Sequence, residues 1–143
     1  MSQSFPKIKI IAVGKVKKSW LKDGIALYVK RLPEIEIMEI KDSNKEKEAD
    51  RLLGMISAQD RLVIMSEHGK IRDSNQFAHW LGQEAFGKLV LFIGGPEGVC
   101  DRLKKYPMVS LSAMTFPHDM ARLMLVEQLY RAKTILQNGR YHK

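Results

Sequence analysis

Short apolar runs alternate along the chain with segments whose apolar residues recur every three or four positions. The runs have the length and composition of strands, and the segments between them have the period of helices. We expect strands over Lys7 to Val13, Ile35 to Ile40, Arg61 to Met65, Lys88 to Ile93 and Met108 to Ser112. This alternation predicts an α/β fold with a mainly parallel sheet flanked by helices.

Three helices are expected between these strands. The first covers Trp20 to Leu32 and carries Leu21, Ile25, Leu27, Tyr28 and Leu32 near helical spacing, with Pro33 closing it. The second starts at the capping box Ser43-Asn44-Lys45-Glu46 and turns Leu52, Leu53 and Ile56 inward. The third starts at Asp73-Ser74-Asn75-Gln76, presents Phe77, Trp80, Leu81 and Phe86 on one face, and ends near Gly87. Because no repeat or long linker divides the chain, we expect residues 1–143 to form a single domain.

The final helix, expected from about Asp119 to Gln137, has apolar side chains around most of its circumference. A surface helix of a monomer buries only one stripe, so we expect a second copy of the chain to cover this helix in a homodimer. Its polar residues Glu127 and Arg131 stand one turn apart. That spacing fits an ordinary ion pair as well as two members of a functional site.

A glycine-rich turn, Gly94-Gly95-Pro96-Glu97-Gly98, follows the apolar run that ends at Ile93. The glycines allow a close backbone approach, which suits either a plain tight turn or a ligand-binding loop at the end of a buried strand. The lysine of a P-loop and the Gly-x-Gly-x-x-Gly of a dinucleotide fold are both missing from the sequence here, so the usual nucleotide-binding motifs are excluded.

The composition favours a polyanionic partner, since 24 Lys and Arg against 16 Asp and Glu give a formal charge of +8. The same excess could serve solubility alone. Metal binding has little support, because His68, His79, His118 and His142 lie far apart and Cys100 is the only cysteine. A single cysteine, no apolar signal core and no run long enough to cross a bilayer point to a reducing cytoplasm.

Five motifs in order along the chain resemble the ribosomal RNA large subunit methyltransferase H family, which belongs to the SPOUT class. They are Lys9 to Lys15, Ile93 to Gly98, Leu111 to His118, Glu127 to Ala132 and Tyr141-His142. The resemblance implies a C-terminal trefoil knot, a homodimer built around it, and methyl transfer from S-adenosylmethionine to N3 of a pseudouridine in 23S ribosomal RNA of the assembled ribosome.

The resemblance also assigns site residues. It places the cofactor against Met65, where the family has leucine, against Gly94, and against the loop Leu111, Ser112, Ala113, Met114, Thr115 and Phe116. The candidate catalytic residues are Glu127, Arg131, Tyr141 and His142, with Lys143 where some members have arginine and Arg140 in place of a common proline. We expect the tail and basic surface of one protomer to complete the site of its partner.

The acceptor nitrogen has to lose its proton, so a base or a stabilising cation is needed near it. Glu127, a neutral His142 and solvent all remain candidates for the base. Two rival functions are a SPOUT methyltransferase acting on a transfer RNA base or a ribose 2′-hydroxyl, and a non-enzymatic RNA-binding accessory protein. Binding of S-adenosylmethionine separates the enzymes from the accessory protein.

Overall fold

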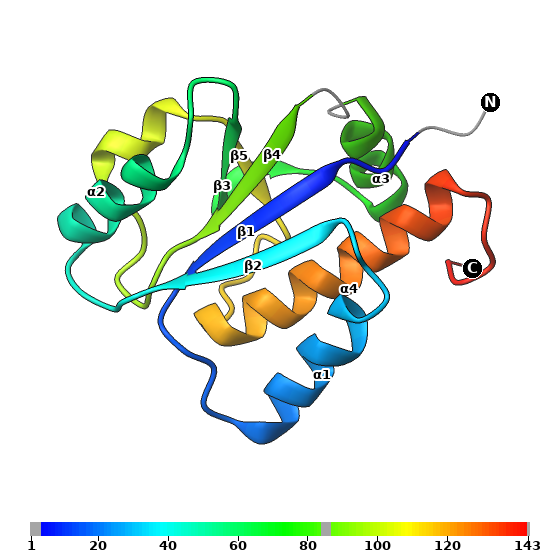
Figure 1. The fold of residues 1–143 in the computed structure, drawn as a ribbon, viewed down its shortest axis with the longest axis horizontal. Coiled ribbons are helices and arrows are strands. Elements are labelled where there is room, and N and C mark those ends of the chain that lie inside the picture. Colours follow the sequence, from blue (N-terminus) through cyan, green and yellow to red (C-terminus); the bar gives the residue numbers. More distant parts are fainter. Residues whose placement is uncertain (1–3, 84–86, 143) are drawn as a thin grey trace.

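The computed structural model describes residues 4–83 and 87–142, and these form an α/β domain built on one five-stranded sheet (Figure 1). Its strands lie in the order β2-β1-β4-β3-β5, and each neighbouring pair is parallel. In chain order the elements are β1 (Lys7–Val13), α1 (Ser19–Val29), β2 (Ile35–Ile40), α2 (Lys45–Met55), β3 (Arg61–Ile71), α3 (Ser74–Gln83), β4 (Lys88–Ile93), the 3₁₀ helix η1 (Asp101–Lys105), β5 (Met108–Ser110) and α4 (His118–Leu136). The predicted fold class is therefore confirmed, while the trefoil knot stays a prediction.

Three of the five strands have the predicted bounds, and two differ. β3 was expected to end at Met65 but continues to Ile71, and β5 ends at Ser110 rather than Ser112. The pairing of β3 with β5 is irregular, because both Met65 and Lys70 face Val109. Gly69 makes this possible, since a Cβ there would lie 2.6 Å from the backbone of Met108 and Val109. No apolar alternation marks this polar extension, so the sequence pattern missed it.

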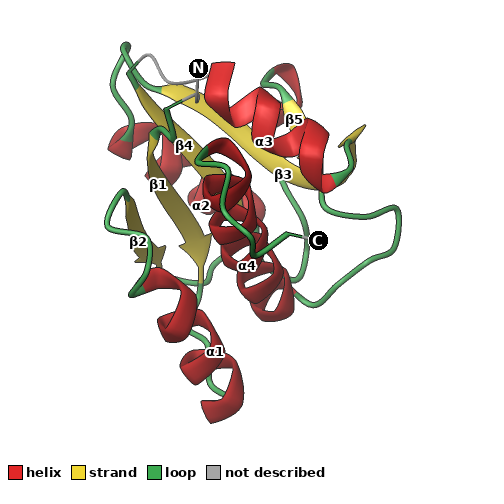
Figure 2. Cartoon of the chain, turned by 90° about the vertical axis from the view of Figure 1, so that its right-hand side faces the viewer, coloured by secondary structure: helices red, strands yellow, loops and turns green. Residues whose placement is uncertain are grey.

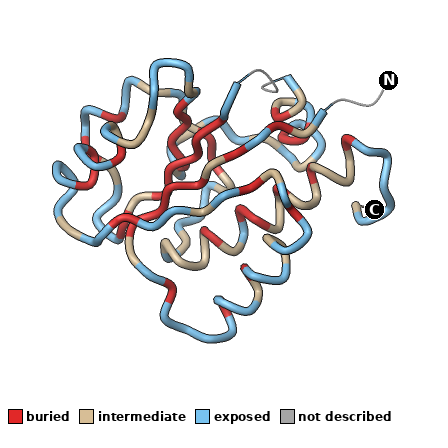
Figure 3. Tube along the Cα trace, viewed as in Figure 1, coloured by how far each residue is buried: buried red, intermediate tan, exposed pale blue. Residues whose placement is uncertain are grey.

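Helices cover both faces of the sheet (Figure 2). One hydrophobic cluster joins one face to α1, α3 and α4, and a second joins the other face to α2 and η1. Figure 3 shows the buried segments concentrated along the central strands. β4 is central and buried on both faces, with burial along every residue from Leu89 to Ile93, which explains its unbroken apolar sequence.

The starts of α2 and α3 are fixed by side-chain caps. In α2 the cap is Asn44, which accepts from the Lys47 amide, and Glu48 accepts from the Ser43 amide, so the predicted capping box is wrong by one residue. In α3 the predicted signal is confirmed, because Asp73 and Gln76 accept from each other's amides. The predicted inward residue Phe86 lies outside the described residues, and Gly87 has a φ of +79°.

The predicted bounds of the first helix are wrong at its end. α1 runs from Ser19 to Val29 rather than from Trp20 to Leu32, and Leu27, one of the apolar residues near helical spacing, is 50% exposed. The 3₁₀ helix η1 was not predicted at all, because five residues are too few to show a period.

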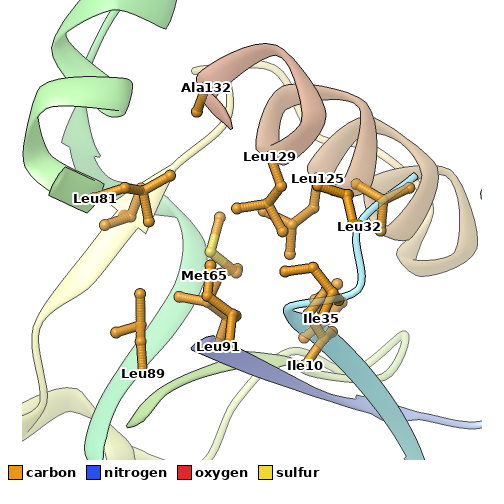
Figure 4. Close-up of a cluster of buried hydrophobic side chains, with 14 of the residues drawn as sticks. Ile10, Leu32, Ile35, Met65, Leu81, Leu89, Leu91, Leu125, Leu129 and Ala132 are labelled. Carbon is orange, nitrogen blue, oxygen red and sulfur yellow. The ribbon is translucent and has the colours of Figure 1, made fainter. Parts of the chain in front are cut away.

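α4 packs against α1 and α3 of its own chain as well as against the sheet. Its Leu125 and Leu129 are fully buried, and Figure 4 shows them pointing into the cluster that contains Ile10 and Leu91. Much of the apolar circumference is thus covered within one chain. The homodimer stays a prediction, and apolar side chains that remain exposed along α1 and α4, among them Trp20 (55%) and Leu27, are the surface available for it.

Within the part of the chain that the structure describes, no helix is long and apolar enough to span a membrane.

Candidate active site

The carboxyl ends of the parallel strands meet at one edge of the sheet, where the chain leaves β1, β2, β4 and β5 (Figure 1). From β1 the chain crosses to β2, and from β4 it crosses past β3 to β5, so their loops diverge. A crevice between diverging loops is the usual ligand site of an open α/β sheet. The glycine turn after β4 therefore lies where this fold class binds ligands.

The glycine turn is closely packed at Gly94. Gly98 donates its amide to the carbonyl of Gly95 at 3.0 Å, which closes the turn. A Cβ at Gly94 would lie 2.9 Å from the Gly98 carbonyl oxygen, so only glycine fits there. The turn is therefore held in its shape by its own backbone, and Gly94 is required for that shape.

The loop after β5 is the second part of the predicted cofactor site, and local hydrogen bonds hold it. Ser110 donates its hydroxyl to the carbonyl of Ser112 and accepts from the Ser112 amide, while the Ser112 hydroxyl accepts from the Met114 amide at 3.0 Å. Thr115 donates to Glu67 on the extension of β3. Ala113, Met114 and Thr115 are exposed, whereas Leu111, Ser112 and Phe116 are half-buried. The loop is thus both shaped and accessible.

Met65, the third predicted cofactor residue, belongs to the hydrophobic core. Its side chain is 9% exposed and lies among Leu81, Leu91 and Leu129 (Figure 4). A wall contact between the thioether and a cofactor is therefore available only through the small exposed part of this side chain.

The predicted catalytic residues come together at the other end of α4. Arg131 donates from Nη2 to Glu127 Oε2 at 2.7 Å, and Tyr141 donates its hydroxyl to the same oxygen at 2.9 Å. Arg131 Nη1 lies 3.0 Å from His142 Nδ1. The guanidinium lies over the Tyr141 ring, 4.9 Å from its centroid. The sequence placed these four residues in one site by resemblance, and the structure brings all four into contact. Lys143 lies outside the described residues.

The contact between Arg131 and His142 fixes the hydrogen-bonding state of the imidazole. A guanidinium only donates hydrogen bonds, so Nδ1 has to accept with its lone pair. The neutral ring then carries its proton on Nε2 and can donate from there. As arranged, His142 is a hydrogen-bond donor toward a substrate, and it can act as a base only after Arg131 leaves Nδ1.

Electrostatics stabilise the charged form of the arginine and the protonated form of the tyrosine. The hydrogen bond with Glu127 raises the pKa of Arg131. Burial, followed by the hydrogen bonds with Tyr28 and Glu127, raises the pKa of Tyr141 far above its usual value. Tyr141 therefore keeps its proton and acts as a donor rather than a base.

Two residues of this cluster were not predicted as site residues. The Tyr28 hydroxyl on α1 lies 3.2 Å from that of Tyr141 and so ties the tail to the first helix. Gln128 donates to Glu127 at 2.8 Å and accepts from Ser74 on α3 at 2.7 Å. Tyr28 read as a core position in the helical pattern, and nothing in the sequence distinguished a core tyrosine from one that holds the tail.

The predicted cofactor loop and the predicted catalytic residues lie at opposite ends of α4 in one chain (Figure 1). The loop ends next to His118, and Arg131 comes 13 residues later. At 1.5 Å per residue this separation is about 20 Å along the helix axis, too far for one methyl transfer.

A cavity of about 390 Å³ borders the glycine turn. It is lined by Asp42 and Ser43 from the β2–α2 connection, by Glu48 of α2, and by Pro96 and Glu97 of the turn. This lining contains none of Met65, Gly94 and the loop Leu111 to Phe116. Burial raises the pKa of Glu48, and the neighbouring carboxyl of Asp42 adds to the effect.

The remaining histidines do not gather into a site. His68 lies exposed on the extension of β3 and His79 exposed on α3, while His118 is the first residue of α4 and sits beside Gly14. Among the residues that the structure describes, no group of three or more His, Cys, Asp or Glu side chains could hold a metal ion.

A family model described as "Predicted SPOUT methyltransferase" matches residues 7–142. The chain therefore belongs to the SPOUT methyltransferase family, and the methyltransferase class agrees with the parallel α/β fold and the ligand-accessible loops at its carboxyl edge.

Curated relatives narrow the assignment. The chain is 48% identical over 139 residues to "Ribosomal RNA large subunit methyltransferase H" of Synechococcus sp. (strain RCC307), covering 96% of this chain and 95% of the relative. It is 47% identical over 137 residues to the protein of the same name from Prochlorococcus marinus (strain MIT 9303), covering 94% and 91%. The protein of that name from Parasynechococcus marenigrum (strain WH8102) is 46% identical over 139 residues, with 96% of each covered. These matches confirm the resemblance inferred from the five motifs.

Proposed function

We propose that this protein transfers a methyl group from S-adenosylmethionine to N3 of a pseudouridine in 23S ribosomal RNA, acting on the assembled ribosome in the cytoplasm. The observation that carries the proposal is the near-full-length match to relatives named for methylation of large-subunit ribosomal RNA. The formal charge of +8 supports a polyanionic substrate.

The carboxyl edge of the sheet suits a nucleoside cofactor. Gly94 is half-buried in a turn whose close packing only glycine allows, and the loop from Leu111 to Phe116 contains the exposed residues Ala113, Met114 and Thr115. Such loops bind an adenosyl group by main-chain hydrogen bonds and apolar contact, without phosphate motifs. When bound, S-adenosylmethionine supplies an electrophilic methyl group on a sulfonium. The protein therefore has to position the acceptor nitrogen and assist the loss of its proton.

The two halves of the site lie about 20 Å apart along α4, and a two-fold dimer removes this separation. If two copies of α4 pack antiparallel, the tail of one protomer lies next to the cofactor loop of its partner. Apolar side chains exposed on α1 and α4, including Trp20, Leu27 and Met124, supply a surface for this contact. We propose that the active site is composite and that the homodimer is its catalytic form.

The cluster of Glu127, Arg131, Tyr141 and His142 contains residues with different proposed roles. Arg131 holds a permanent positive charge that favours the anion developing as the acceptor nitrogen loses its proton. Glu127 fixes Arg131 and Tyr141, and it already accepts three hydrogen bonds. His142 forms one wall of the site and donates a hydrogen bond from Nε2 to the target nucleobase. The proton of the acceptor nitrogen passes to Glu127, to His142 once its Nδ1 is free, or to solvent.

The first test measures cofactor binding and the identity of the product. Calorimetry with S-adenosylmethionine should show binding, whereas an RNA-binding accessory protein would show none. Ribosomes, free ribosomal RNA and transfer RNA are then offered in parallel, and mass spectrometry identifies the modified nucleoside. Methylation of a transfer RNA base or a ribose hydroxyl would overturn the proposed substrate. The His142→Ala variant should bind cofactor normally but turn over more slowly, and unchanged methylation by it would exclude the proposed role of the tail.

Complementation between two variants of reduced activity tests the composite site. Gly94→Val blocks the cofactor turn, and His142→Ala removes the tail side chain. In a mixed dimer one of the two sites combines an intact turn with an intact tail. Random exchange makes half of the dimers mixed, so the mixture should regain about a quarter of wild-type activity. No recovery after verified subunit exchange would show that each chain works with its own tail.

A further inference from the structure

A second cavity, of about 360 Å³, lies between α1, β2 and the beginning of α4. Its walls are mainly apolar and include Ile25 and Val29 of α1 and Ile37 of β2. Three cations also line it, namely Lys15, Lys22 and Arg122. The proposed methyl transfer uses none of these side chains.

One wall of this cavity carries a buried arginine that is paired with a carboxylate. Arg122 is 4% exposed, donates from Nη1 to Glu39 at 2.5 Å and from Nη2 to the carbonyl of Gly14 at 3.0 Å. Its Nε has no hydrogen-bond partner among the residues described. Glu39 is the only carboxylate in the lining, so it offsets one of the three cations. Neither Lys15 nor Lys22 forms an ion pair with any described residue, which leaves both ammonium groups available to an anion.

The proposed dimer leaves this cavity accessible. At about 100° per residue, the exposed Leu27 points about 140° away from Lys22 and about 160° away from Val29 around α1. The apolar face that suits a second copy and the cavity face thus lie on different sides of the helix. The cavity also lies near the cofactor edge, because Arg122 is one helical turn after His118, and His118 sits beside the Gly14 to which Arg122 donates.

An apolar slot with cations in its lining suits a nucleotide, whose flat base needs apolar contact and whose phosphate needs cations. Single-stranded RNA is recognised by bases that leave the stack and enter such pockets, while lysines hold the phosphates. We propose that this cavity binds one unstacked nucleotide of the RNA substrate, with its base between α1 and β2 and its phosphate at Lys15 and Lys22. The proposal rests on the proposed function and names a substrate-binding site outside the reaction centre.

Two variants test the two halves of this site. Ala26 is exposed and lines the cavity, so Ala26→Phe fills it without changing charge. Lys22→Glu reverses one cation. The matched controls are Ala58→Phe in an exposed turn and Lys47→Glu on α2, which make the same chemical changes outside the cavity.

Steady-state methylation of ribosomes is the main measurement. Losing the apolar contact to one base should raise KM for ribosomes at least about fivefold in Ala26→Phe, the effect of about 40 Å² of buried apolar surface. Lys22→Glu should raise KM and reduce the slope of log KM against log salt by about one. For both variants we expect kcat and the affinity for S-adenosylmethionine to stay at wild-type values. A KM equal to that of the controls would overturn the proposal.

A binding experiment separates the cavity from the reaction. Nuclear magnetic resonance with uridine 5′-monophosphate should shift the signals of Ile25, Val29 and Ile37 more than uridine or inorganic phosphate does, and Ala26→Phe should abolish these shifts. No shifts at these residues would also overturn the proposal. Shifts together with an unchanged KM would mean that the ligand is a free nucleotide, not the RNA. If wild-type protein does not methylate ribosomes, the proposed function fails, while the nucleotide experiment still decides whether the cavity binds its ligand.

Discussion

The hydroxyl group of Tyr141 gives the sharpest test of how the tail is held. It donates to Glu127 at 2.9 Å and lies 3.2 Å from the hydroxyl of Tyr28. The ring makes separate contacts, edge-on to Tyr130 with centroids 4.8 Å apart and beneath the guanidinium of Arg131. Tyr141→Phe therefore removes only the hydrogen bonds and keeps the packing of the ring.

The size of the effect follows from these bonds. A hydrogen bond to a charged group contributes about 1.5–3 kcal/mol. Because Tyr141 is 38% exposed, water compensates part of the loss, and the lower end of about 1.5 kcal/mol applies. That energy corresponds to about a tenfold drop in the equilibrium constant between the held and the released tail. We expect kcat to fall by up to about tenfold, with cofactor affinity and the midpoint of thermal unfolding nearly unchanged, because the tail is not part of the core.

The assay is methylation of ribosomes with radiolabelled S-adenosylmethionine at saturating substrate, with calorimetry for cofactor binding. Tyr106→Phe, which removes a tyrosine hydroxyl next to η1, is the matched control. A kcat within twofold of the control would refute the reasoning, since the hydroxyl would then not hold the working tail. A large loss of thermal stability would also contradict it, because the change would have reached the core.

Three further substitutions test other parts of the structure. Arg131→Lys should lower kcat with cofactor affinity retained, because one ammonium group cannot reproduce the two-sided contact with Glu127 and His142, and full activity in the methylation assay would contradict this. Glu48→Gln should stabilise the fold at neutral pH. Burial raises the pKa of Glu48 above its ordinary 4.5, so the stability that comes from protonating this carboxyl is fully present below pH 4.5. That stability is lost as the pH rises through the raised pKa. Urea unfolding should show the gain at pH 7 and none near pH 4, and an equal gain at both would refute the cause. Leu129→Ala, at a fully buried position of α4, should lower the free energy of unfolding by about 2–5 kcal/mol, and a urea midpoint unchanged from wild type would mean that this contact is not part of the core.

Most of the fold could be predicted because burial imposes a period on the sequence. The run from Leu89 to Ile93 is apolar throughout because β4 has helices over both faces. The extension of β3 beyond Met65 could not be predicted in the same way. Its pairing with β5 depends on a close backbone approach at Gly69, and a backbone contact leaves no hydrophobic pattern.

The candidate site could likewise be predicted only in part. Local chemistry and family motifs identified the glycine turn, the pair of Glu127 and Arg131, and the tail. The part played by Tyr28 could not be found, because Tyr28 and Tyr141 are 113 positions apart and touch only after α1 packs on α4. The same packing covers much of α4, the helix whose apolar circumference alone had suggested a second chain.

The sequence by itself determined the class of fold, the order of its elements and the residue types of the site, because apolar period, turn chemistry and motif spacing are properties of neighbouring residues. Only the tertiary structure decided which distant residues meet. It brought Tyr28 to the tail and Arg122 to Glu39, and it set the predicted cofactor loop and the predicted catalytic residues at opposite ends of α4. These outcomes depend on how helices pack across the sheet, and packing is fixed by the shape of the whole core rather than by any local pattern.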